Sequence, residues 1–268
     1  MTDLNLLVDT HCHLDHERME ISADEAVSMA HEQGIAWMVT IGTSLNNSEN
    51  MASFIEPWDN VYATVGIHPE GTAIHRHQSQ NVAKRLSNLL HQRHIVGVGE
   101  TGLDYYYENS DRAAQAELFH AHCELAADAH KTLIVHSRDA ERDTVDILQS
   151  HLKKKSFPVI IHCFTGSQWL ADAVQEMGCM ISLSGIVTFK NAKALQDTAM
   201  TIKPSHLLVE TDSPYLAPTP KRGKVNQPSY VRYTAEYLAN LRGESLSDLA
   251  QYTTANAHRI FAVQQPKS

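Results

Sequence analysis

Residues 132–136 read Thr-Leu-Ile-Val-His and residues 158–162 read Pro-Val-Ile-Ile-His, two short apolar runs that each end in a histidine. Each run is too short for a helix, and a continuous apolar run is typical of a strand buried on both faces of a parallel sheet. Similar runs occur at 6–9, 36–41, 61–67, 95–100, 179–183 and 207–211. Stretches with apolar residues at helical spacing fill the gaps, for example 24–33, 113–130, 144–152 and 230–241. This alternation predicts an α/β fold.

The length of the chain selects among α/β folds. Eight strand–helix units in 268 residues give about 33 residues per unit, close to the roughly 31 of a 250-residue (β/α)8 barrel. No Gly/Ser/Pro-rich linker divides the chain, and the proline-rich stretch 214–228 is expected to be a long ordered loop after the eighth strand. We predict a single (β/α)8 TIM-barrel domain over residues 1–268, with a helical tail near 246–261.

Charge and cysteine content exclude several classes of protein. The net charge of −9 provides no overall attraction to nucleic acid or to an anionic membrane, so a polyanionic substrate must be held locally. The four cysteines match neither a zinc-binding CxxC pattern nor a disulfide framework, and we expect reduced thiols. The amino-terminal residues lack the pattern of a leader, and no apolar run reaches 18 residues. We therefore expect a cytoplasmic protein with no membrane contact, and we predict no protein partner.

Two histidines lie where the first predicted strand ends. His11 and His13 are two positions apart, and an extended chain directs side chains at this spacing to the same side. The His-x-His pattern also occurs in a polar stretch at 75–77 and in a predicted helix at 120–122, where the two side chains diverge by about 200°. Only the first pair is expected to bind metal. The alternative is a structural role, which is usual for a buried histidine.

Other residues of metal-binding type stand at the ends of later predicted strands, namely Glu100, His136, His162 and Asp212. In a (β/α)8 barrel the carboxyl ends of all strands meet at one mouth. Each residue taken singly is equally well explained as a hydrogen-bonded polar group at a strand end. Burying two carboxylates and four imidazoles close together without a cation would cost free energy. The six residues as a set therefore predict a metal site.

The ligand types define the metals expected. Nitrogen and oxygen donors without thiolate suit Zn²⁺, Mn²⁺ or a similar divalent ion such as Mg²⁺. Six ligands exceed the need of one tetrahedral zinc and fit two open sites. We assign one ion to His11, His13 and Asp212 and the other to His136 and His162, with Glu100 as the bridging carboxylate. A water between two ions ionises near neutral pH, and Asp212 is expected to orient it and accept its proton.

These residues fall in motifs that extend along nearly the whole chain. The motifs are Asp-Thr-His-Cys-His-Leu-Asp at 9–15, Val-Gly-Ile-His-Pro at 65–69, Gly-Glu-Thr-Gly-Leu-Asp-Tyr-Tyr-Tyr at 99–107, His-Ser-Arg-Asp-Ala at 136–140, His-Cys-Phe-Thr-Gly at 162–166, Ser-Gly-Ile-Val-Thr-Phe at 184–189 and Glu-Thr-Asp-Ser-Pro-Tyr-Leu-Ala-Pro at 210–218. With them the chain resembles the TatD family of metal-dependent hydrolases, in its YcfH-type branch. The resemblance implies an amidohydrolase-like TIM barrel, two divalent ions on the same six ligands, and hydrolase activity, chiefly as a deoxyribonuclease.

Substrate contacts are expected on the same side as the metal ligands. His68 and Arg138 follow the third and fifth strands, and either side chain suits a phosphate oxygen as a hydrogen-bond donor. Lys221, Arg222 and Lys224 form the densest basic loop, after strand eight, where barrels often bind phosphate. The alternatives are an ordering hydrogen bond for His68, a structural carboxylate partner for Arg138, and a solvated surface for the basic loop.

The sequence is compatible with three functions. The leading prediction is exonuclease-type hydrolysis of DNA phosphodiester bonds by a metal-activated water, favoured by the basic loop and Arg138. The second is hydrolysis of an amide or ester, for example an aminoacyl bond, by the same two metals. The third, a non-catalytic metal-binding scaffold, fits poorly with a complete ligand set that leaves room for water.

Overall fold

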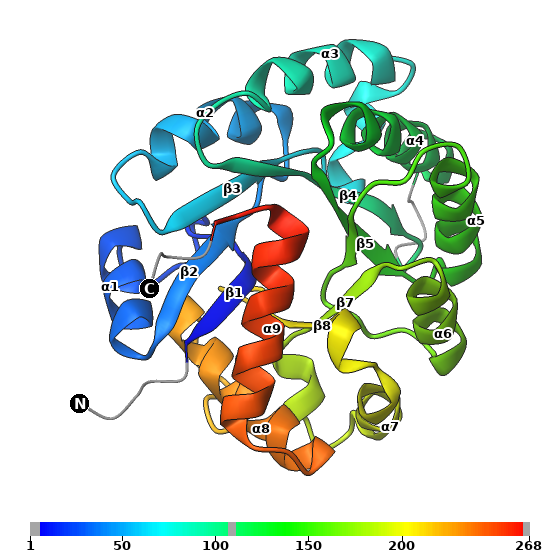
Figure 1. Ribbon diagram of the computed structural model, residues 1–268. Coiled ribbons are helices and arrows are strands. Elements are labelled where there is room, and N and C mark those ends of the chain that lie inside the picture. The colour runs from blue at the N-terminus through cyan, green and yellow to red at the C-terminus, as the bar shows by residue number, and fades with distance from the viewer. Residues whose placement is uncertain (1–5, 107–110, 265–268) are drawn as a thin grey trace. The chain divides into compact units, whose positions relative to one another are not determined.

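A computed structural model describes residues 6–106 and 111–264 (Figure 1). Within these ranges eight parallel strands follow one another in the sheet in chain order, β1 to β8, and helices alternate with them. The predicted (β/α)8 fold class is therefore confirmed. Contacts divide the chain into two compact units: unit 1 comprises Met1–Thr40, Cys163–Ser167 and Ile181–Ser268, and unit 2 comprises Ile41–His162 and Gln168–Met180. The single-domain organisation stays a prediction.

Unit 1 contains the strands at the two ends of the sheet order. They are β1 (Leu7–Cys12), β2 (Ile35–Thr40), β7 (Met180–Leu183, whose first residue belongs to unit 2) and β8 (Leu207–Val209). β1 pairs with β2 and β7 with β8, both in parallel. A parallel bridge between Cys12 and Ser213 links the end of β1 to the segment after β8. The first and last strands of the order are thus neighbours, as a closed sheet requires.

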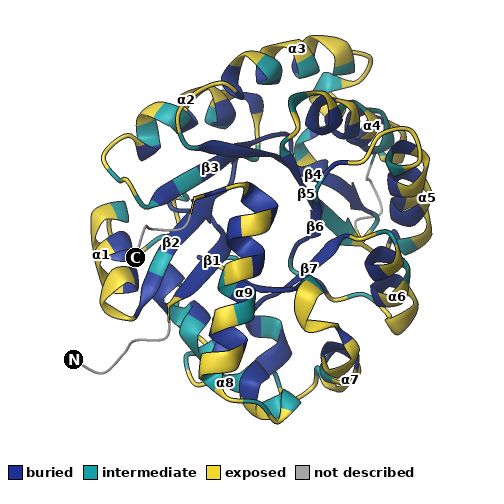
Figure 2. Cartoon of the chain, in the orientation of Figure 1, coloured by how far each residue is buried: buried dark blue, intermediate teal, exposed yellow. Residues whose placement is uncertain are grey.

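The helices of unit 1 are α1 (Ala23–Glu32), α7 (Lys193–Thr201), α8 (Val231–Arg242) and α9 (Leu246–Phe261). Short 3₁₀ turns lie at Gly185–Thr188, Pro204–His206 and Pro228–Tyr230. α9 begins after the N-cap Ser245, whose hydroxyl accepts a hydrogen bond from the Asp248 amide, and has a buried and an exposed side (Figure 2). It covers the predicted helical tail residue for residue.

Unit 2 contains the four middle strands, β3 (Val61–Val65), β4 (Ile95–Asp104), β5 (Thr132–Arg138) and β6 (Val159–Ile161). Its helices are α2 (Leu45–Ile55), α3 (Ser79–Leu89), α4 (Arg112–Ala129), α5 (Glu141–Leu152) and α6 (Gln168–Glu176), with 3₁₀ turns at Pro69–Gly71 and Ala73–His75. β4 is buried throughout. It runs four residues beyond Glu100, so the expectation that Glu100 ends this strand was wrong. The pairing of Gly102 with His136 and of Asp104 with Arg138 continues the ladder to Asp104.

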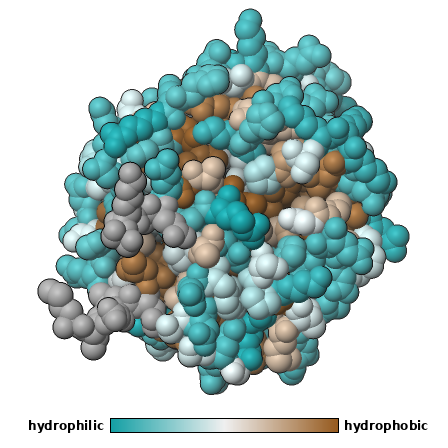
Figure 3. All heavy atoms as spheres, viewed as in Figure 1, coloured by the Kyte–Doolittle hydropathy of each residue, from teal (hydrophilic) through white to brown (hydrophobic). Residues whose placement is uncertain are grey.

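The remaining features agree with the composition of the chain. Cys12, Cys123, Cys163 and Cys179 are free thiols, as expected. Hydrophilic side chains cover most of the face shown in Figure 3. Among the described helices, none combines the length and the hydrophobicity that crossing a bilayer requires.

Candidate metal centre

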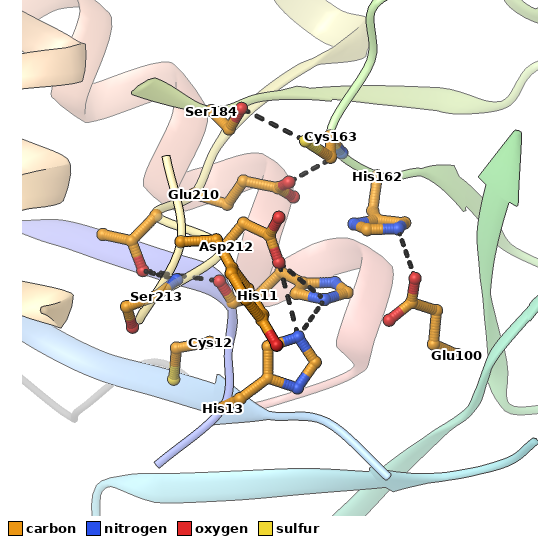
Figure 4. A network of polar contacts seen from close by, with 12 residues as sticks. His11, Cys12, His13, Glu100, His162, Cys163, Ser184, Glu210, Asp212 and Ser213 are labelled. Atoms are coloured by element: carbon orange, nitrogen blue, oxygen red, sulfur yellow. Dashed lines mark hydrogen bonds and ion pairs between the residues drawn. The ribbon is translucent and has the colours of Figure 1, made fainter. Parts of the chain in front are cut away.

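Unit 1 brings together three of the six predicted ligands. His11 lies in β1, His13 follows one residue after its end, and Asp212 follows β8. The Nε2 atoms of His11 and His13 are 3.3 Å apart, and Asp212 Oδ1 lies 3.6 Å from the first and 3.3 Å from the second (Figure 4). Both rings are buried. Three potential ligand atoms thus form a compact triangle, which we call the unit 1 donor set.

Main-chain contacts hold this triangle. The Asp212 amide donates to the His11 carbonyl at 2.9 Å, and Asp212 has φ of 56°, in the left-handed region that non-glycine residues seldom adopt. Asp9, buried in β1, accepts hydrogen bonds from the amides of His11 and Thr211. Burial raises the pKa of Asp9 to about 8, against the effect of the Thr211 and His11 hydrogen bonds. Asp9 therefore ties the two segments that carry the ligands.

Unit 2 brings together the other three predicted ligands. Glu100 Oε1 lies 2.7 Å from His162 Nε2 and 3.1 Å from His136 Nδ1, and these two nitrogens are 3.2 Å apart. His68 Nε2 lies 3.4 Å from the same Glu100 oxygen. Glu100 is buried and comes from β4, His136 from β5, and His162 from the residue after β6. We call Glu100, His136, His162 and His68 the unit 2 donor set.

Asp104 stands behind this set. Its Oδ2 accepts a hydrogen bond from His136 Nε2 at 3.0 Å, and its Oδ1 accepts one from the Tyr106 amide. Burial by itself lowers the pKa of His136, but the hydrogen bonds to Asp104 and Glu100 outweigh it and the pKa is raised. Burial raises the pKa of Asp104, and the hydrogen bonds from His136 and Tyr106 outweigh it, so that this pKa is lowered. With its far nitrogen bonded to a carboxylate, His136 directs Nδ1 at Glu100.

Both donor sets fit a divalent ion. A tetrahedral zinc with bonds of 2.0–2.1 Å places its ligand atoms about 3.3 Å apart, and the spacings within the two sets run from 2.7 to 3.6 Å. A carboxylate oxygen and an imidazole nitrogen that both act as acceptors need a shared cation or proton at such distances. The carboxylate behind His136 is the usual partner of a metal-binding histidine. His68, Glu100 and His136 also present ligand atoms close enough to share an ion.

A close approach of two glycines positions Glu100. A Cβ at Gly66, after β3, would lie 2.5 Å from both the Cα and the carbonyl carbon of Gly99. Any side chain at position 66 would therefore displace the residue directly before Glu100. Glycine is required here because the two backbones touch.

The sequence reading missed three buried carboxylates, Asp9, Asp104 and Glu210. Glu210 accepts a hydrogen bond from the Cys163 amide at 2.6 Å, and Cys163 Sγ lies 3.3 Å from Ser184 Oγ (Figure 4). All three carboxylates belong to the motifs that contain the ligands, and each lies two to four residues from one of them. A search for carboxylates near each ligand would have found them.

The residues predicted to bind substrate make different contacts. The ring of His68 caps the turn Pro69–Gly71, with Nδ1 accepting from the Glu70 amide. Arg138 is exposed and places its guanidinium carbon 3.6 Å from the centre of the Tyr106 ring. In the basic loop, Lys221 lies over Tyr230 and Tyr233, Arg222 lies over Phe189, and Lys224 is exposed. Arg138, Lys221 and Arg222 therefore each pack on aromatic rings, and no two of them share a ring.

The two histidines of the His120/His122 pair have separate partners. His122 is buried in α4, its Nδ1 donates to the Leu118 carbonyl at 2.7 Å, and its Nε2 accepts from the Ile67 amide. His120 points away from it and contacts His151 at 2.8 Å. Burial lowers the pKa of His122 to about 4. This histidine is a neutral structural residue.

Comparisons with known proteins agree with this geometry. The model of the family described as TatD related DNase matches residues 8–262. The chain is 40% identical over 260 residues to the metal-dependent hydrolase YcfH of Escherichia coli (strain K12), with 96% of each chain covered. It is 36% identical over 258 residues to the metal-dependent hydrolase YabD of Bacillus subtilis (strain 168), covering 96% of this chain and all of the relative.

The fold is also similar to that of a solved structure. The crystal structure of YJJV, a TatD homologue from Escherichia coli K12, superposes with a TM-score of 0.87 at 27% identity, covering 96% of this chain and 98% of the other. The family match, the relatives and the two donor sets lead to one assignment. The chain belongs to the TatD family of metal-dependent hydrolases.

Proposed function

We propose that this hydrolase is a deoxyribonuclease that removes nucleotides from a strand end with two divalent ions. The observation that carries the proposal is the buried Glu100 oxygen within 3.1 Å of nitrogens from both His136 and His162. The description of the matching family as TatD related DNase supports DNA as the substrate. Zn²⁺, Mn²⁺ and Mg²⁺ are the candidate ions.

The donor sets have distinct roles in this proposal. The unit 1 donor set would hold one ion, and Glu100, His136 and His162 would hold the other. That Glu100 is shared by both ions stays a prediction. When bound, the ions polarise the phosphodiester and lower the pKa of a water molecule. Asp212 accepts the proton of the attacking water at Oδ1 or Oδ2, because its side chain is 14% exposed whereas that of Glu100 is 3% exposed. Asp104 holds the proton at His136 Nε2.

The substrate side uses donors around these sets. His68 and Arg138 bind phosphate oxygens, and Lys221, Arg222 and Lys224 supply the local positive charge that the acidic chain lacks overall. His68 meets Glu100 through Nε2, so this nitrogen can serve either a phosphate oxygen or an ion. A His68→Gln variant separates the two roles: loss of metal indicates a ligand, and a higher KM at full metal content indicates substrate binding.

The test begins with metal analysis of the purified protein, followed by assays on DNA labelled at either end. We expect cleavage of linear single- or double-stranded DNA that stops with a chelator and returns when metal is added. Circular single-stranded DNA should resist, and its cleavage would show that the enzyme does not need a strand end. Metal-dependent hydrolysis of an aminoacyl ester with no cleavage of DNA would overturn the proposal in favour of the acyl hydrolase.

A further inference from the structure

Unit 2 presents two exposed aromatic rings on segments that follow two of the strands of its donor set. Tyr106 follows β4, which carries Glu100, and is 55% exposed. Trp169 lies in the first turn of α6, seven residues after His162, and is 47% exposed. Its neighbours Leu170 and Ala171 are buried, so α6 packs its other side against the protein. Two large rings therefore face solvent on segments that leave the strands of the candidate metal centre.

Each ring is paired with an arginine, Arg138 at the end of β5 or Arg142 in the first turn of α5. The guanidinium carbon of Arg138 lies 3.6 Å from the centre of the Tyr106 ring, and that of Arg142 lies 5.6 Å from the Trp169 ring. Arg138 is two residues from His136 and ends β5. The guanidinium adds a cation–π attraction to the ring, and the exposed part of each ring is open to a planar group from solution.

Hydrogen bonds connect Tyr106 to the donor set. Its amide donates to Asp104 Oδ1 at 3.0 Å, and Asp104 is the carboxylate that holds His136. The preceding Tyr105 is fixed differently: its hydroxyl donates to Asp143 at 2.7 Å, and Arg112 lies 4.1 Å from its ring centre. The loop thus anchors one tyrosine and exposes the next, two residues from the carboxylate behind the metal ligand.

The segment that carries the two arginines has no excess of positive charge. Residues 138–143 contain Arg138 and Arg142 together with Asp139, Glu141 and Asp143. Long-range attraction to phosphate is therefore weak here, and a ligand must be recognised mainly by contact. Every nucleobase has a flat face that stacks on an aromatic side chain, whereas a paired base inside a duplex offers none.

We propose that Tyr106 and Trp169, each backed by its arginine, form a stacking surface for the unpaired bases beside the phosphate that is cleaved. This inference rests on the proposed DNA hydrolysis and names the residues that hold the bases. Base stacking on one aromatic side chain changes affinity by about 5- to 150-fold. Removing either ring should therefore raise KM by that factor and leave kcat on a small phosphodiester unchanged.

The experiment compares Tyr106→Leu and Trp169→Leu with the wild type, using a labelled single-stranded oligonucleotide and methyl p-nitrophenyl phosphate, which has no bases. Trp169→Phe should restore most of the affinity because it keeps an aromatic face. Trp58→Leu, at a half-buried tryptophan before β3, is the matched control and should bind like the wild type. The dependence of affinity on salt should be the same in the wild type and in the ring variants, since only uncharged contacts are lost.

Binding in the presence of a chelator separates this inference from the proposed function. An oligonucleotide with abasic sites near one end should bind the wild type more weakly than the intact strand does, and the double variant Tyr106→Leu/Trp169→Leu should bind the two strands equally. Equal affinity of wild type and variants for the intact strand would overturn the stacking surface even if DNA is cleaved. Ring-dependent binding without cleavage would support the surface and overturn the nuclease. Absence of any binding would overturn both.

Discussion

The two donor sets differ in what stands behind their ligands. In unit 2, the carboxylate of Asp104 holds the far nitrogen of His136, and Glu100 is 3% exposed. In unit 1, the main chain positions the ligands through the Asp212 amide and the His11 carbonyl, and Asp212 is 14% exposed. From this comparison we expect unit 2 to retain an ion more firmly and Asp212 of unit 1 to be the carboxylate that accepts a proton.

The largest effect is expected at Glu100. Glu100→Gln removes the carboxylate that faces both His136 and His162, so hydrolysis should fall to the level of the metal-free protein, and metal content should fall with it. Metal analysis and a hydrolysis assay on one preparation check this. Glu124→Gln, at an exposed position of α4, is the control. Full metal content in the Glu100 variant would show that this carboxylate is not a ligand.

Asp212→Asn should separate chemistry from metal retention. The amide keeps the size of the side chain and cannot accept the proton, so kcat should fall about 10²- to 10⁴-fold. The metal held by unit 2 should remain, since its donors are unchanged. Loss of the unit 1 ion in parallel with the fall in kcat would attribute the effect to Asp212 as a ligand and would contradict its role as the base. The measurement is kcat together with metal content.

Asp104→Asn tests the carboxylate behind His136. Loss of such a partner reduces metal affinity or activity by about 10- to 100-fold. The change should appear in a competitive metal titration, and excess metal should recover most of the activity. Asp172→Asn, exposed on α6, controls for the loss of one negative charge. If excess metal restored nothing, Asp104 would act in the reaction itself.

The basic loop of unit 1 should have a smaller effect. Changing Lys221, Arg222 and Lys224 together to Gln should weaken DNA binding roughly 10-fold and reduce the slope of log affinity against log salt by about 2, if each cation neutralises one phosphate of a single strand. Anisotropy titrations at several salt concentrations measure both. An unchanged slope would assign Lys221 and Arg222 to packing on the rings that they cover.

The smallest effect on activity is expected at His122, which lies outside both donor sets. Because its pKa in the folded protein is about 4, below the usual 6.5, the unfolded chain binds the proton first as pH falls. The neutral His122 contributes fully to stability above pH 6.5. As the pH falls from 6.5 to 5, protonation of this histidine in the unfolded chain lowers the free energy of unfolding by about 2 kcal/mol.

Urea unfolding of the metal-free protein at a series of pH values measures this dependence. His122→Gln should be less stable at pH 7, and its stability should fall less steeply below pH 6.5. His31→Gln, at an exposed position of α1, should keep the wild-type slope. Equal slopes for all three proteins would show that His122 does not control the acid sensitivity.

Much of the fold was predictable because buried parallel strands leave an unmistakable pattern. The run that ends at His136 lies in β5, the run that ends at His162 contains β6, and α9 lies where the helical tail was predicted, near 246–261. Strand ends were less predictable. β4 continues past Glu100 to Asp104 because, after an irregularity in the register between Val98 and Thr101, backbone pairing with β5 resumes and extends to Arg138.

The sequence by itself determined the strand–helix order, the family and the six candidate ligands, since each depends on local pattern or on motifs. Only the tertiary structure decided which ring nitrogen of His136 faces Glu100, that Asp104 stands behind it, and that Arg138 packs on Tyr106. Such choices depend on distances between segments remote in the chain, and those distances exist only once the strands have paired and their side chains are desolvated.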